Sequence, residues 1–112
     1  MEPENGMNYD TIHQCLQGCR FTDHARREME TEPLGRISTD EILAVFDAGA
    51  IIEEYPEDAP YSSCLIFGYT RQQRPLHIVC APVLDEGRLI IITVYQPDPV
   101  RWEADWRRRK PR

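Results

Sequence analysis

Long apolar runs and closely paired cysteines are missing from this chain, and each absence excludes a class of protein. No stretch of 18 apolar residues occurs, and the first eight residues, Met1–Asn8, are polar and acidic. We therefore predict neither a membrane span nor a signal peptide, and expect a cytoplasmic protein. The 112 residues suffice for one hydrophobic core but not for two, so we predict a single domain over residues 1–112, with a flexible N-terminus at residues 1–8.

The four cysteines also lack the spacing of a zinc site. They stand at positions 15, 19, 64 and 80, and no Cys-x-x-Cys pair occurs. Because zinc sites need close pairs of ligands, Cys15 and Cys19 with three scattered histidines match poorly. We expect buried free thiols, with no metal and no other cofactor.

Basic residues are scarce except at the C-terminal end. Residues 1–100 carry 7 Arg against 17 Asp or Glu, a net charge of −10, whereas residues 101–112 carry 6 basic and 2 acidic residues, a net charge of +4. An acidic body does not attract RNA at long range, which weighs against tight nonspecific binding of nucleic acid by the body. The basic tail, residues 107–112, is either solvated or contacts phosphate or an acidic partner.

Helical patterns precede strand patterns, which favours an α+β fold with an antiparallel sheet. We predict two to three N-terminal helices packed on a four-stranded antiparallel meander. The capping box Ser38-Thr-Asp-Glu41 begins the third helix, and Gly49 stands where a left-handed C-terminal cap belongs. Trp102 and Trp106 are spaced to anchor a short terminal helix. The predicted helices cover 8–17, 24–30 and 38–48, and the predicted strands cover 50–55, 61–70, 75–84 and 88–95.

The hairpin of the last two strands is the most informative segment. If its loop is Asp85-Glu-Gly87, then Leu84 lies opposite Arg88, and counting back sets His77 opposite Tyr95 and Val79 opposite Thr93. An imidazole, a phenol and a hydroxyl then share one sheet face, together with Val79 and Leu89. The other face, with Ile90, Ile92 and Val94, is predicted to meet the helices. We expect the first face to be covered by the Trp-bearing tail or by a second copy of the chain, as in a homodimer.

Several segments together resemble domain of unknown function family 4258, from Phe21 to Arg109. They are Thr22-x-His24-Ala25, Gly49-Ala-Ile-Ile-Glu-Glu-Tyr-Pro56, Arg74-Pro-Leu-His77-Ile-Val and Ile92-Thr-Val-Tyr95-x-Pro-Asp-Pro-x-Arg-Trp102. The family pattern marks His24, His77 and Tyr95. One departure is Glu28, because many members carry Arg there, and an acidic residue disfavours phosphate binding by that helix turn.

The resemblance implies a protein similar to the RelE and ParE toxins, which place helices against a small antiparallel sheet. Such a toxin is neutralised by an antitoxin protein, here of the zinc-finger type, and RelE-like toxins cleave RNA without a metal. The resemblance implies catalytic roles for His24, His77 and Tyr95, and phosphate binding by Arg27 or Arg101. The alternative is a non-catalytic protein-binding module with the same fold, in which His77 and Tyr95 form only a packed cross-strand pair.

Overall fold

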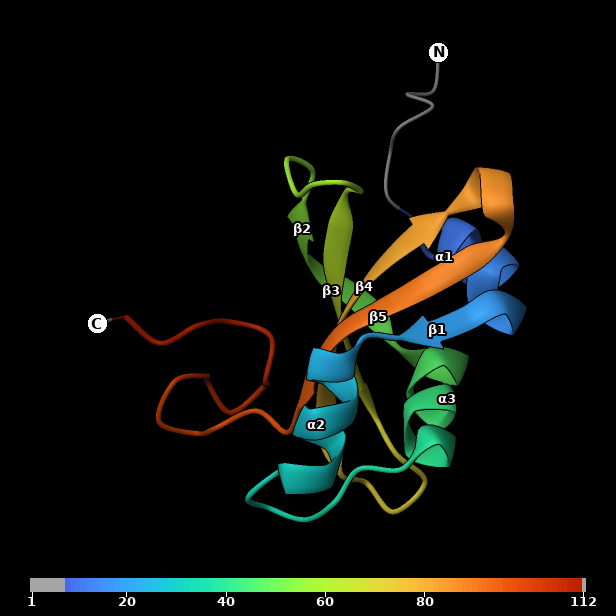
Figure 1. Ribbon diagram of the computed structural model, residues 1–112. Coiled ribbons are helices and arrows are strands. Elements are labelled where there is room, and N and C mark those ends of the chain that lie inside the picture. Colours follow the sequence, from blue (N-terminus) through green and yellow to red (C-terminus); the bar gives the residue numbers. More distant parts are fainter. Residues whose placement is uncertain (1–7, 112) are drawn as a thin grey trace.

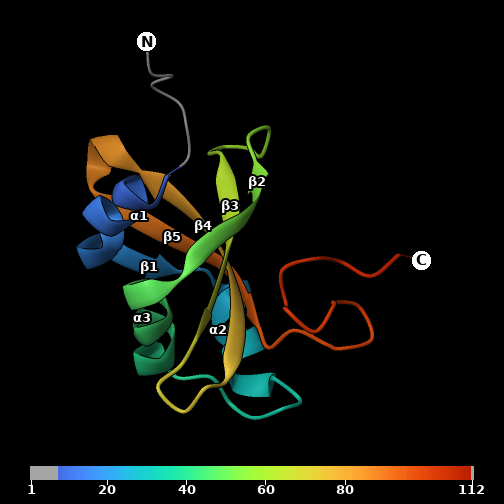
Figure 2. The same ribbon diagram turned by 180° about the vertical axis from the view of Figure 1, so that it is seen from behind.

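The computed structural model describes residues 8–111, which form an α+β fold with three α-helices and a five-stranded mixed sheet. Figures 1 and 2 show α1 and α3 on one side of the sheet and the C-terminal chain on the other. The helices are α1 (Tyr9–Cys15), α2 (Asp23–Thr31) and α3 (Thr39–Ala48), and 3₁₀ turns cover Leu16–Gly18 and Leu84–Glu86. The strands are β1 (Cys19–Phe21), β2 (Ala50–Tyr55), β3 (Ser63–Tyr69), β4 (Pro75–Val83) and β5 (Arg88–Tyr95).

The sheet order is β1-β5-β4-β3-β2. The strands β2 to β5 form the predicted four-stranded antiparallel meander, but β1 pairs with β5 in parallel, so the sheet is five-stranded and mixed where a purely antiparallel one was predicted. Three residues are too few to show the period-2 alternation by which a strand is recognised in a sequence. Cys19 and Phe21 nevertheless pack against the core while Arg20 is exposed, as in a half-buried strand.

Each helix begins at a side-chain cap. Asn8, which was predicted to lie in a flexible N-terminus, accepts a hydrogen bond from the Thr11 amide and caps α1. Thr22 caps α2, and Ser38 and Glu41 form the predicted capping box of α3. The rest of the predicted flexible terminus, residues 1–7, lies outside the described residues.

Helix α2 also closes the edge of the sheet where β1 ends. The Glu28 carboxylate accepts a hydrogen bond from the Val94 amide at 2.9 Å, and the Glu32 carboxylate accepts one from the Gln96 amide at 3.1 Å. Ala25 and Met29, on the same helix, face the core. The residue at which the chain departs from the family pattern, Glu28, therefore pairs with backbone at this edge.

The core lies between the helices and one face of the sheet. Phe46 and Ile42 of α3 are fully buried against strand residues of this face. The contacting strand residues are aliphatic or cysteine: Cys64, Ile66, Leu76, Ile78, Cys80, Leu89, Ile91 and Val94. At 25 cal/mol per Å² of buried apolar surface, a cluster of this kind is the main stabilising term of the fold.

The β4–β5 hairpin confirms the predicted pairing of His77 with Tyr95 and of Val79 with Thr93. Nearer the turn, however, Val83 and not Leu84 lies opposite Arg88, and the register shifts by one residue at Ile92. This β-bulge moves the following side chains to the other face. The predicted helix-facing set is therefore right for Val94 and wrong for Ile90 and Ile92, whose places are taken by Leu89 and Ile91.

Two further local predictions are wrong. Gly49 has φ −76° and ψ 176°, so it does not form a left-handed cap. Glycine is needed there because the backbone of Gly49 lies close to that of Val45: a Cβ atom at Gly49 would lie 2.7 Å from the Val45 carbonyl oxygen. Trp102 and Trp106 do not form a terminal helix; they lie in an irregular hairpin in which Trp106 has a positive φ of 62°.

Candidate functional site

The C-terminal chain crosses the sheet face opposite the helices, and we call residues 97–111 the strap (Figure 1). Its backbone bonds are largely its own: the Glu103 amide donates to the Arg108 carbonyl and the Lys110 amide to the Arg101 carbonyl, both at 2.8 Å. Trp102 and Arg109 are bridged as in a short hairpin. The expectation that the tail covers this face is confirmed.

His77 is the centre of the contact between the strap and the sheet. Its side chain is fully buried, with Nε2 2.7 Å from the Trp106 carbonyl oxygen and Nδ1 3.2 Å from the Tyr95 hydroxyl. Because a carbonyl only accepts, Nε2 carries the proton and Nδ1 accepts from Tyr95. The Trp102 ring stands edge-on to the imidazole, with ring centroids 4.3 Å apart.

Burial governs the protonation of this site. It lowers the pKa of His77 to about 4, since the charged imidazolium is poorly solvated there. It also raises the pKa of Tyr95 to about 12. At neutral pH both side chains are therefore uncharged, and the imidazole that accepts from the Tyr95 hydroxyl donates to the Trp106 carbonyl of the strap.

A second contact fastens the strap to β2. The Arg109 guanidinium binds the Glu53 carboxylate through two bonds, Nε to Oε2 at 2.8 Å and Nη2 to Oε1 at 3.0 Å. These bonds lower the pKa of Glu53, and Tyr55 also donates to its carboxylate. The same guanidinium lies 4.6 Å from the centre of the Trp102 ring, a cation–π distance. Arg107 lies in the same way 5.3 Å from the ring centre of Phe67 on β3.

We call the sheet residues that receive the strap the strap site: Glu53, Tyr55, Phe67, His77 and Tyr95. They come from β2, β3, β4 and β5. The pairing of these strands places all five side chains on the same face of the sheet, with Phe67, His77 and Tyr95 in one row of paired residues. Together they offer a carboxylate, two phenols and aromatic rings. This is a surface suited to an arginine- and tryptophan-bearing peptide.

His24 lies in a different environment, at the exposed N-terminal end of α2. About 66% of its side chain is exposed, and its Nε2 lies 3.3 Å from the Glu28 carboxylate. Arg27 is exposed one helix turn after His24, and Arg101 is exposed at the start of the strap hairpin. The structure thus joins His77 with Tyr95, and it pairs His24 with Glu28.

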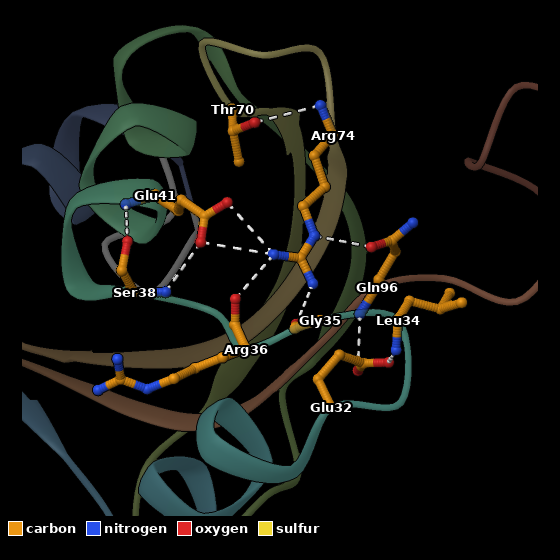
Figure 3. A network of polar contacts seen from close by, with 9 residues as sticks. All are labelled: Glu32, Leu34, Gly35, Arg36, Ser38, Glu41, Thr70, Arg74 and Gln96. Carbon is orange, nitrogen blue, oxygen red and sulfur yellow. Dashed lines mark hydrogen bonds and ion pairs between the residues drawn. The ribbon is translucent and has the colours of Figure 1, made fainter.

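Arg74, the first residue of the motif Arg74-Pro-Leu-His77, was not predicted as a site residue, yet it holds four segments together (Figure 3). Its guanidinium donates to the Gln96 side chain at 2.7 Å, to the carbonyls of Gly35 and Arg36, and to the Glu41 carboxylate. The motif Arg74-Pro-Leu-His77 therefore carries two residues that bind backbone carbonyls of distant segments. Glu53 and Trp102 were also not predicted as site residues, although the alternation along β2 places Glu53 with Tyr55.

An open groove lies between α3 and the β3–β4 turn. Its volume is about 730 Å³, and its walls include the carboxylates of Asp40 and Asp47, the exposed Leu43, and Arg71. An acidic groove with an apolar wall suits a basic amphipathic segment.

A family model for a domain of unknown function, DUF4258, matches residues 21–96. The chain belongs to the DUF4258 family. The matched region contains α2, α3, every strand-borne residue of the strap site, and Arg74, whereas the strap lies beyond it. No curated protein and no solved structure matches the chain.

The described residues of this DUF4258 protein contain neither a cluster of metal-ligating side chains nor a membrane-spanning helix. Within residues 8–111, no group of three His, Cys, Asp or Glu side chains is placed to hold a metal ion. Among the same residues, no helix has the length and apolar character to cross a membrane.

Proposed function

We propose that this DUF4258 protein is a catalytically silent protein-binding module with a RelE-like fold, which holds a polypeptide segment on its sheet face. The observation that carries the proposal is the use of His77. One ring nitrogen donates to the Trp106 carbonyl of the strap and the other accepts from Tyr95 on β5, so the first holds the strap and both are already engaged within the protein.

The protonation of the site supports a binding role. A general acid or base works best when its pKa lies near the working pH and when it reaches the substrate. His77 has a pKa of about 4 and is fully buried, and the pKa of Tyr95 is about 12. Neutral, hydrogen-bonded aromatic side chains suit the holding of a peptide better than proton transfer.

The partner that we propose is a protein with a basic segment. The resemblance to toxins implies an antitoxin of the zinc-finger type, and the charge of the groove beside α3 supports a basic partner. Asp40 and Asp47 give the groove carboxylates, and Leu43 gives it an apolar contact that is 38% exposed.

A metal-independent endoribonuclease, the toxin of a toxin–antitoxin pair, is the second candidate, and the environment of His24 favours it. This imidazole is exposed, and the Glu28 carboxylate at 3.3 Å orients it as a base-orienting group does in catalytic triads. Arg27, exposed on the same helix, is available for a phosphate. An RNA substrate would then bind at α2.

An RNA cleavage assay separates the two candidates. General acid–base catalysis contributes about 100- to 10,000-fold, so a ribonuclease would lose its activity in His24→Ala and keep it in the matched variant Glu30→Gln, an exposed residue of the same helix. The binding module predicts no RNA cleavage that depends on His24, and no growth arrest on expression that His24→Ala relieves. His24-dependent cleavage by the purified chain would overturn the first proposal in favour of the second.

A further inference from the structure

The strap is built as a separate unit. Its backbone hydrogen bonds join strap residues to one another, as in Glu103 to Arg108, Lys110 to Arg101 and Trp106 to Glu103. Its anchoring contacts with the sheet are those of His77, Glu53 and Phe67. A hairpin that keeps its own backbone bonds can leave the strap site without unfolding.

The link between β5 and this hairpin is short and exposed. Residues 98–100 are exposed, Val100 to 78%, and the segment contains Pro99 after the buried Pro97. Asp98 starts a turn by accepting from the amides of Val100 and Arg101. A change of direction at these three residues redirects the hairpin while the sheet stays intact.

We propose that the strap is an exchangeable ligand and that the strap of a second copy of this chain occupies the strap site, in a reciprocal dimer. This inference rests on the proposed binding role of the sheet face and names its occupant. Each copy carries one strap and one strap site, so a two-fold exchange repeats every contact of the closed chain. The charges are complementary in either arrangement, because residues 101–112 carry +4 and residues 1–100 carry −10.

Concentration decides between the closed and the exchanged forms. A segment tethered by a short flexible link has an effective concentration on the order of millimolar, so the closed form prevails at micromolar protein. The exchange is revealed when closure within one chain is disfavoured but closure between two chains is not.

The pair Glu53 and Arg109 provides such a test. In Glu53→Arg this position of the strap site and Arg109 of the strap are both positive, and in Arg109→Glu both are negative, so closure within one chain is disfavoured in each variant. When the two variants are mixed, exchange places Arg109 of one chain on Glu53 of the other, and the new Glu on the new Arg. The double variant E53R/R109E restores closure within one chain and is the matched control.

Mass from light scattering and the fluorescence of the buried Trp102 are the measurements. We expect a dimer in the equimolar mixture, monomers of each single variant and of the double variant, and buried Trp102 fluorescence in the mixture and the double variant only. A mixture that stays monomeric while the double variant closes overturns the exchange. If a single variant alone fails to fold, recovery of a folded dimer on mixing supports the proposal, and no recovery contradicts it.

None of these measurements involves RNA. A His24-dependent ribonuclease activity would therefore remove the proposed function without deciding the exchange, and a failed exchange would leave binding of other polypeptides to the sheet face intact.

Discussion

The two faces of the sheet are covered in different ways. On the helix side, Phe46, Ile66 and Ile78 belong to a continuous apolar cluster in which side chains from α1, α2 and α3 meet those of the strands. On the strap side, the contacts are few and directional: a buried imidazole bonded to a carbonyl, a guanidinium bonded to a carboxylate, and aromatic rings in edge-to-face contact.

The apolar packing of the helix side and the hydrogen bonds of the strap side differ in how easily the packed segments can separate. Apolar burial is non-directional and scales with area, so the helix side resists separation as a whole. Hydrogen bonds to a few defined atoms can be remade by another segment that presents the same atoms. One face of this small domain is therefore joined by continuous apolar packing, whereas the other holds the strap through a few directional bonds, as the proposed exchange requires.

The largest expected effect is on the helix side. Phe46→Ala removes a fully buried ring and should lower the free energy of unfolding by about 3–5 kcal/mol. Chemical denaturation followed by circular dichroism measures the loss. Leu34→Ala, at a side chain that is 59% exposed, is the control and should change it by less than about 0.5 kcal/mol. If Trp102→Ala on the strap costs as much global stability as Phe46→Ala, the two faces form one cooperative core and the comparison fails.

A smaller effect is expected from acid, and it belongs to the strap side. The pKa of His77 is about 4 in the folded protein and near 6.5 when the chain is unfolded, so between these values only the unfolded state takes up the proton. Stability should therefore fall as pH drops from 6.5 to 4, by up to about 3 kcal/mol at 1.36 kcal/mol per pKa unit.

Denaturation curves at several pH values test this dependence. His77→Gln, which keeps an amide for hydrogen bonding, should be less stable at pH 7 but lose the slope between pH 6.5 and 4. An unchanged slope in His77→Gln would assign the acid sensitivity to other groups, Glu53 with its lowered pKa among them.

The smallest of the three effects concerns Arg74, which lies on neither face but joins the ends of several segments (Figure 3). Arg74→Lys keeps the charge and loses the fork that binds Gln96 and the backbone carbonyls of Gly35 and Arg36, so we expect a loss of about 2 kcal/mol. Arg71→Lys, at an exposed residue of the adjoining turn, should be neutral. Equal stability of the two variants would show that Arg74 acts through its charge alone.

The sequence predicted the helices through their caps and the meander through its alternating patterns, because both signals are local. It predicted the pairing of His77 with Tyr95 although the assumed turn was one residue too short. The loop takes in Leu84, and the bulge at Ile92 adds one residue on the other strand, so the two errors cancel beyond the bulge. Between the turn and the bulge they do not cancel, and there Leu89 and Ile90 were assigned to the wrong faces, as was Ile92 at the bulge itself.

What the sequence could not predict depends on contacts between distant segments. β1 is recognisable only by its pairing with β5, some 70 residues away. The pattern marked His77 and His24 alike, but His77 is buried beneath the strap, whereas His24 is exposed on α2. Glu53 was interpreted as one of several acidic surface residues, because its partner Arg109 lies 56 residues further along the chain and no local pattern connects the two.

The carboxylates of Glu28 on α2 and of Glu32 at its C-cap affect how this protein can associate. Glu28 and Glu32 occupy backbone donors of β5 and Gln96 that a neighbouring chain would need in order to add a strand there. Open strand edges are where sheets of different molecules join and fibres grow. With these donors occupied by side chains that are also negatively charged, a second molecule is kept from adding a strand along the end of β5 that β1 leaves uncovered.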